Sequence, residues 1–174
     1  MIGQGFAIWI TGLPASGKST IVAALVKKLE MRKIFPLVLE SDRMRRILTP
    51  DATYDEDERD RFYLQLAGIG EVAYRSGVPV IFDATGNRRA YRDRARTTIN
   101  RFVEVYVHSP LDVCMSRDPK GIYAAARAGS SVTVPGIQSL YEPPDRPELV
   151  LDGTKPPEFN AERILELLET FRYV

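Results

Sequence analysis

The chain has 174 residues, of which 44% are hydrophobic; this length supports one well-buried core, and two independent domains would be cramped. Its 24 basic and 23 acidic residues leave a formal charge of +1, so no global field would draw the protein to nucleic acid or to an anionic membrane. The single cysteine, Cys114, excludes an intrachain disulfide framework and a cysteine zinc site.

These properties indicate one domain over residues 1–174. No apolar run approaches the ~20 residues of a membrane span. Residues 1–6 also lack the charged start of a secretory signal. We therefore expect a cytoplasmic protein with a small-molecule partner, and neither a membrane nor a nucleic acid as partner. Cys114 and the only histidine, His108, are expected to be core residues.

Short apolar runs rich in branched residues alternate with segments of helical periodicity along the chain. The expected elements, in chain order, are strand 6–10, helix 18–31, strand 35–39, helices 42–48 and 57–75, strand 78–82, helix 88–100, strand 102–108, strand 149–151 and helix 161–171. A short helix is expected between Ser109 and Arg117, with Ser109 as its cap and Pro110 in its first turn. Alternation of this kind predicts an α/β fold, in which helices cover both faces of a parallel sheet.

A phosphate-binding loop follows the first expected strand. The pattern G-x-x-x-x-G-K-[ST] is completed here, and the loop consists of Gly12, Leu13, Pro14, Ala15, Ser16, Gly17, Lys18, Ser19 and Thr20. Its two glycines let the backbone wrap a phosphate where a Cβ would collide. Lys18 can reach the β- and γ-phosphates, and Ser19 can place its hydroxyl on Mg²⁺ at the positive end of the following helix. The loop therefore predicts ATP and Mg²⁺ as cofactors, since a chance glycine-rich turn would not require the strand-loop-helix context.

Carboxylates follow the second expected strand. If this strand lies close to the first, Asp42, or less favourably Glu40, lies beside the phosphate loop and can orient or deprotonate an acceptor hydroxyl. An ordinary helix start, in which Ser41 caps and Asp42 offsets the helix dipole, is compatible with that role.

The third expected strand delivers Asp83 to the edge where open α/β sheets bind ligands. Such an aspartate commonly helps to hold the hydrated Mg²⁺ opposite the loop serine, although a helix-cap role is the alternative. On the next helix, Arg88, Arg92 and Arg96 share one face, and Arg88 is the closest of them to the strand end. An anion such as phosphate or sulfate would suit Arg88, while a solvated charged face paired with Asp93 is the alternative for the others.

Residues 117–147 break the alternating pattern with repeated glycine and proline. A segment so irregular within a compact domain is functional or disordered. Because it carries Arg117, Lys120 and Arg127, we interpret it as a lid that folds over bound phosphates; a surface loop is the alternative.

Several blocks resemble the adenylylsulfate (APS) kinase family. They are residues 113–123, which contain R-D-P-K-G-x-Y, followed by Ala126 to Gly129, residues 141–144 (Y-E-P-P) and residues 147–149 (P-E-L). Together with the phosphate loop, this similarity covers most of the chain.

The resemblance implies a fold and a reaction. The fold is a phosphate-loop nucleotide-kinase three-layer sandwich with a five-stranded parallel sheet and a lid, often dimeric. The reaction transfers the γ-phosphate of ATP to the 3′-hydroxyl of adenosine 5′-phosphosulfate, giving the activated sulfate donor of sulfate assimilation. By position, Asp42 and Arg45 match the family's D-G-D-N segment and the arginine after it, Arg59 matches its D-R stretch, and Thr85 its I-S-P serine. Arg117 and Lys120 fall in the lid motif, where they would stabilise the transition state; Arg88 and Lys120 would also bind the acceptor.

The departures from the family pattern concentrate at the acceptor side. Glu40, Ser41 and Arg43 replace three residues of D-G-D-N, and Tyr54 and Val134 stand where the family clamps the acceptor base between two phenylalanines. Residues 82–85 instead look like a segment of polynucleotide-kinase and zeta-toxin-like kinases. Two alternatives therefore stay open: the same reaction on another 5′-modified nucleotide or a polynucleotide end, and a nucleotide-binding regulatory module without transfer activity.

Overall fold

The computed structural model describes residues 5–129 and 133–174. The strands are β1 (Ala7–Thr11), β2 (Leu37–Glu40), β3 (Val80–Asp83), β4 (Phe102–His108) and β5 (Leu149–Asp152). The helices are α1 (Lys18–Met31), α2 (Ser41–Leu48), α3 (Glu56–Arg75), α4 (Arg89–Thr98), α5 (Leu111–Arg117), α6 (Ile122–Arg127) and α7 (Pro157–Thr170). None of these helices is both long and apolar enough to cross a membrane.

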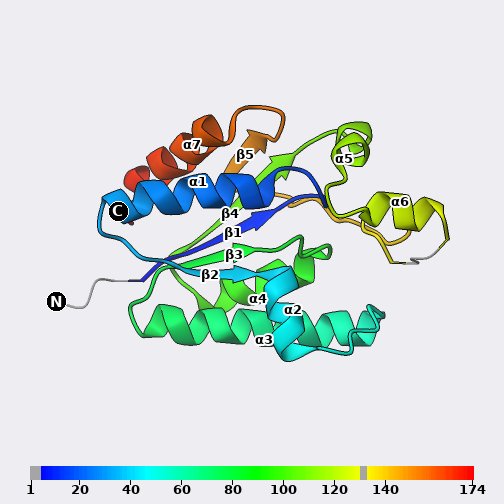
Figure 1. Cartoon of the computed structure of the whole chain (residues 1–174). Coiled ribbons are helices and arrows are strands. Elements are labelled where there is room, and N and C mark those ends of the chain that lie inside the picture. The colour runs from blue at the N-terminus through cyan, green and yellow to red at the C-terminus, as the bar shows by residue number, and fades with distance from the viewer. Residues whose placement is uncertain (1–4, 130–132) are drawn as a thin grey trace.

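The five strands form one sheet in the order β2-β3-β1-β4-β5, and every pairing is parallel. This confirms the expected α/β fold with a five-stranded parallel sheet. In register, Asp83 lies opposite Ile10 on one side and Glu40 on the other. Figure 1 shows α5 and α6 beyond the edge where the strands end.

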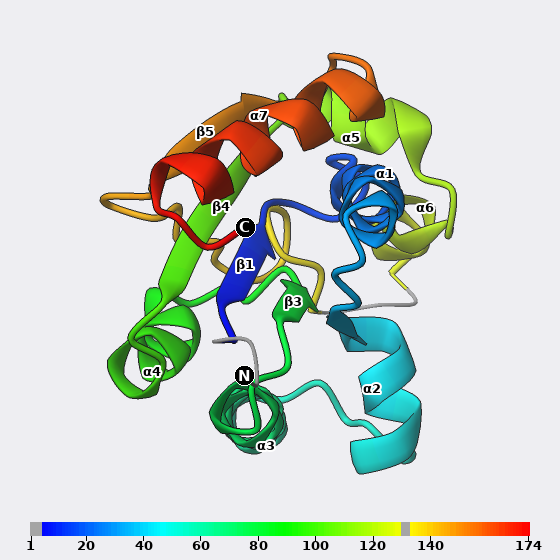
Figure 2. The ribbon, with the colours of Figure 1, turned by 90° about the vertical axis from the view of Figure 1, so that its left-hand side faces the viewer.

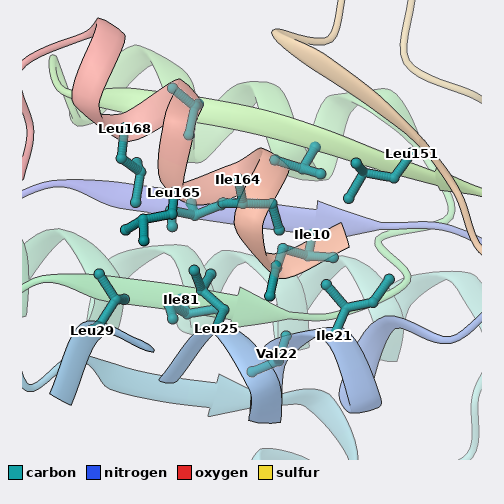
Figure 3. Packing of buried hydrophobic residues seen from close by; sticks show 14 of the residues in the cluster. Ile10, Ile21, Val22, Leu25, Leu29, Ile81, Leu151, Ile164, Leu165 and Leu168 are labelled. Carbon is teal, nitrogen blue, oxygen red and sulfur yellow. The ribbon is translucent and has the colours of Figure 1, made fainter. Parts of the chain in front are cut away.

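Helices cover both faces of the sheet, because the strands alternate their side chains between two cores. Ile8 and Ile10 of β1 pack with α1 and α7 in one core, whereas Ala7 and Trp9 pack with α3 and α4 in the other. Figure 2 shows the two helix layers on opposite sides of the sheet. Figure 3 shows the first core, in which strand residues meet leucines of α1 and α7.

The sequence left open whether the second strand lies close to the first; it lies next to β3, so β3 separates Glu40 from the strand that leads into the phosphate loop. Other expectations were wrong. His108, expected in the core, is exposed at the end of β4. Ser109 does not cap α5; its hydroxyl is buried and donates to the Ser16 carbonyl at 3.0 Å. The C-terminal helix begins at Pro157, because proline fits a first helical turn. Helix α6, within the irregular segment 117–147, was not expected; residues 130–132 of that segment lie outside the described residues.

Candidate active site

A pocket of about 610 Å³ opens at the carboxyl ends of the strands. Twelve of the residues singled out from the sequence line it: Pro14, Ala15, Gly17, Lys18, Ser19, Thr20, Glu40, Asp42, Asp83, Thr85, Arg117 and Lys120. They come from the phosphate loop, α1, β2, α2, the ends of β3 and α5, and the start of the lid. The sheet edge predicted from parallel-strand topology therefore gathers the predicted chemistry in one place.

The phosphate loop turns into α1 at Gly17, whose φ of 104° favours glycine over any residue with a side chain. The following residue, Lys18, is 8% exposed, and its ammonium donates to the carbonyls of Gly12 at 3.0 Å and Leu13 at 2.7 Å. Burial lowers the pKa of Lys18 to about 8, and Asp83 opposes that shift. The amine is thus held on the loop backbone, in a position from which it can turn to a phosphate.

Two later segments support the loop from outside. Ser109 donates to the Ser16 carbonyl, and Arg117 Nη1 donates to the Gly153 carbonyl at 3.0 Å. Gly153 lies so close that a Cβ built on it would be 2.2 Å from the Ser16 carbonyl oxygen. The backbones of the phosphate loop and the β5–α7 loop are therefore packed in contact, with Arg117 alongside.

Ser19 and Asp83 form an oxygen-rich pair at the pocket. The Asp83 carboxyl is 4% exposed; burial raises its pKa, while a hydrogen bond with Ser19 and the charge of Lys18 lower it. No cluster of three or more His, Cys, Asp or Glu side chains that could hold a metal occurs among the described residues. One carboxylate with one hydroxyl suits Mg²⁺, which keeps several waters and takes its remaining ligands from substrate phosphates.

Asp42 and Lys120 meet across the pocket. Lys120, between α5 and α6, donates a hydrogen bond to the Asp42 carboxylate in the first turn of α2, and this bond raises the pKa of Lys120. Both side chains are about half exposed. The carboxylate expected to act on an acceptor hydroxyl is thus occupied by a lid lysine, although β2 is not adjacent to β1.

The acceptor-side residues Arg45, Tyr54, Arg59 and Arg88, predicted from the sequence, do not line this pocket. Arg45 is buried between the rings of Phe62 and Tyr54 and pairs with Glu58 at 2.6 Å. Arg59 is buried against backbone carbonyls. Arg88 pairs with Glu56.

Val134 and Arg92 depart from their expected surroundings. Val134 is 3% exposed and packs against Cys114 and Tyr123, so in this conformation it offers no face to a base. Arg92 is neither an anion site nor part of a solvated face: it is 1% exposed and pairs with Glu104 at 2.5 Å. A carboxylate on the neighbouring strand, rather than Asp93 on the same helix, neutralises it.

The sequence also matches known proteins. Residues 4–152 match the family model described as adenylylsulphate kinase. The chain belongs to the adenylylsulphate kinase family. It is 41% identical over 146 residues to the adenylyl-sulfate kinase of Rippkaea orientalis, covering 84% of this chain and 81% of the relative. It is 34% identical over 168 residues to the enzyme of Klebsiella pneumoniae, covering 95% and 84%.

Solved structures agree with the adenylylsulphate kinase assignment. The chain superposes on the Mycobacterium tuberculosis APS kinase CysC, solved in complex with AMPPNP and APS, with a TM-score of 0.91, 32% identity and coverage of 96% of this chain and 99% of that one. Shikimate kinase from Aquifex aeolicus shares the fold, with a TM-score of 0.58 at 18% identity. The resemblance seen in the sequence is therefore confirmed.

The adenylylsulphate kinase pocket includes residues that sequence reasoning missed. The β5–α7 loop contributes Gly153, Thr154, Lys155, Pro156 and Pro157, and the lid contributes Asp118, Pro119 and Ile122. A signal for the loop was available, because it follows a strand of a parallel sheet and such loops gather at the ligand-binding edge. The strand before this loop, β5, has only four residues and gives a weak local signal.

Proposed function

We propose that this protein transfers the γ-phosphate of ATP to the 3′-hydroxyl of adenosine 5′-phosphosulfate, giving 3′-phosphoadenosine 5′-phosphosulfate and ADP. The observation that carries the proposal is the convergence of Lys18, Ser19 with Asp83, and Asp42 with Lys120 in one pocket of an adenylylsulphate kinase family member. These are the parts that phosphoryl transfer needs: a phosphate cradle, a metal shell, a carboxylate for the nucleophile and mobile cations.

The loop backbone from Gly12 to Thr20 binds the polyphosphate, and Lys18 leaves its carbonyl partners to contact the β- and γ-phosphates. Ser19 and Asp83 would hold Mg²⁺ with its waters, and the bound metal would neutralise charge on the phosphate oxygens. The charge of Lys18 then lies where negative charge is concentrated in the transition state.

Asp42 orients the 3′-hydroxyl and accepts its proton. The bond between that oxygen and the γ-phosphorus forms as the bond from the γ-phosphorus to the bridging oxygen of ADP breaks. For this, Lys120 must leave Asp42, and its ammonium, with Arg117, is then free to contact the transferred group. Glu40 and Thr85 of the pocket bind the acceptor, together with the residues predicted from the sequence that lie outside the pocket lining: Arg45, Tyr54, Arg59 and Arg88.

Another acceptor should also be tested, because two residues at acceptor-side positions are not free to bind APS in this conformation. Arg45 is paired with the Glu58 carboxylate, and Val134 is buried. The experiment measures ADP release from Mg-ATP with APS, AMP or a 5′-hydroxyl oligonucleotide, and reads the product masses. A 3′-phosphorylated sulfate nucleotide formed only with APS supports the proposal; turnover confined to another acceptor contradicts it. Lys18→Ala should abolish turnover, whereas Lys27→Ala, on the exposed side of α1, should not.

The proposal also covers the cellular location and the oligomeric state of the protein. We infer a cytoplasmic enzyme of nucleotide metabolism that forms the homodimer implied by its family resemblance. Light scattering coupled to size-exclusion chromatography tests the homodimer directly, and a monomeric mass would contradict it.

A further inference from the structure

Asn87 lies in the turn between β3 and α4 and is 4% exposed. Its side-chain oxygen accepts a hydrogen bond from Arg59 Nη1 at 3.3 Å, and its side-chain nitrogen donates to the Leu140 carbonyl at 3.0 Å. Its backbone carbonyl accepts from the Glu142 amide at 2.7 Å. Asn87 therefore joins α3, the end of β3 and the returning part of the lid.

The hydrogen-bond acceptors of Arg59 are neutral oxygens. Its Nε donates to the Tyr54 carbonyl at 3.0 Å, and its Nη2 donates to the Thr133 carbonyl at 2.5 Å. Among residues 5–129 and 133–174, Arg59 donates hydrogen bonds only to carbonyl and amide oxygens, and it forms no ion pair within 4.0 Å. Arg45, nearby, differs because the Glu58 carboxylate bonds to it directly.

A buried guanidinium that is bonded only to neutral acceptors has no carboxylate paired with it directly; Glu58 favours its charge from nearby, and Arg45 opposes it. Burial lowers the pKa of Arg59, because the charged form is costly in that place. An anionic ligand would remove that cost, and a planar guanidinium suits the oxygens of a phosphate or sulfate group.

We propose that Asn87 is a positioning residue that holds Arg59 through a neutral amide, so that the charge of Arg59 remains available to the anionic phosphosulfate group of the acceptor. This inference rests on the proposed function. Asn87 itself does not touch the reacting atoms; it fixes the direction of Arg59 and ties Leu140 of the lid to the same place.

The identity of the residue matters because an aspartate of the same size would strengthen the bond to Arg59 and lose the bond to Leu140. Its carboxylate would give Arg59 an internal counter-charge, in competition with the acceptor. It would also turn the donor to the Leu140 carbonyl into an acceptor, leaving two oxygens facing each other.

The test is Asn87→Asp, with steady-state kinetics in both substrates. We expect the KM for APS to rise about tenfold or more, while the KM for ATP and kcat at saturating APS stay within about twofold. Asn87→Ser, which is neutral and smaller, should raise the KM for APS by about two- to fivefold, less than Asn87→Asp does. Should the aspartate variant fail to fold, an unchanged KM for APS in Asn87→Ser would overturn the inference.

The matched control is Asn160→Asp. Asn160 is 1% exposed on α7, across the sheet from Arg59, and its side chain donates to the Asp152 carbonyl at 2.8 Å. The KM for APS should not change in this variant. Any loss of stability in it measures the general cost of burying a carboxylate.

Two results would overturn the inference: an unchanged KM for APS in Asn87→Asp, or Asn87 variants that lose only thermal stability and kcat, as a structural role would predict. A wild-type protein that does not phosphorylate APS would remove the proposed function and this inference together. If the wild type phosphorylates APS and Asn87→Asp has the same KM for APS, this inference alone is wrong.

Discussion

Lys120 of the lid donates a hydrogen bond to the Asp42 carboxylate of α2, so the residue proposed to accept a proton is paired with a residue proposed to stabilise the transferred phosphate. The pair links two elements that are 78 positions apart in the sequence. Under the proposed mechanism, an incoming acceptor hydroxyl would replace Lys120 at Asp42, so acceptor entry would be coupled to release of the lysine.

Asp42→Asn should lower kcat with APS by about 10²- to 10⁴-fold, the range for loss of a general base. Binding of Mg-ATP should persist, because the phosphate loop is untouched. Coupled ADP release and calorimetric ATP binding measure the two effects. Asp51→Asn, an exposed carboxylate beyond α2, is the matched control and should behave as wild type. Unchanged turnover in Asp42→Asn would remove Asp42 from the mechanism.

Lys120→Ala should lower kcat by about tenfold or more, as removal of one stabilising cation does. It should change the free energy of unfolding by less than about 1 kcal/mol, because the pair is half exposed. The raised pKa of Lys120 means that the pair's small stabilisation is present below the ordinary lysine pKa and is lost as pH rises through the higher folded value. Arg127→Ala, a lid cation outside the pocket lining, is the control; equal activity of both variants would contradict this role.

Proton uptake should accompany ATP binding at pH 8.5 and be nearly absent at pH 6.5. The reason is that burial lowers the pKa of Lys18 to about 8, and a polyphosphate beside it raises that pKa again. Titration calorimetry in buffers of different ionisation enthalpy measures the uptake. In Lys18→Arg the guanidinium stays charged, so uptake should disappear; uptake that persists would assign it to another group.

The same lowered pKa has a consequence for stability without nucleotide. Between pH 8 and the unfolded value of 10.5, the unfolded chain binds more protons at Lys18 than the folded one. The contribution of Lys18 to the free energy of unfolding therefore rises with pH across this window. Urea titrations of wild type and Lys18→Arg should diverge there, and parallel curves would contradict the assignment.

Two glycine-to-alanine substitutions should have opposite effects. In Gly153→Ala the new Cβ would lie 2.2 Å from the Ser16 carbonyl oxygen and 2.3 Å from Ser109 Oγ, so the phosphate loop must shift. We expect a loss of about 1–3 kcal/mol of stability and weaker ATP binding. In Gly68→Ala, within α3, a Cβ meets nothing within 4 Å, and helix propensity should add about 0.5–1 kcal/mol. Thermal melts of both variants, with and without ATP, measure the changes in stability and in ATP binding.

The sequence predicted the elements with strong local signals. The phosphate loop was placed correctly because a glycine-rich pattern must follow a strand and open a helix, and α1 begins at Lys18 as expected. Asp83 at the end of β3 and Asp42 just after β2 were found because an apolar run followed by a carboxylate is visible locally. Their meeting in one pocket follows from parallel topology.

What sequence reasoning missed depends on contacts between distant segments. The position of β2 beside β3 is a matter of sheet order, which no local pattern encodes. The burial of Arg92 depends on Glu104 from the neighbouring strand, and Ser109 is directed to the phosphate loop rather than to its own helix. Helix α6 has six residues, too few for a visible periodicity.

During synthesis, the phosphate loop is made before the residues that support it, which are Ser109, Arg117 and Gly153. The loop is among the first parts of the chain to be made, yet the residues that hold its backbone come about 90 or more positions later. A nascent chain that has not reached β5 carries the whole nucleotide motif without the contacts that shape it. Competence to bind nucleotide should therefore arrive late in translation, as a property of the nearly finished chain.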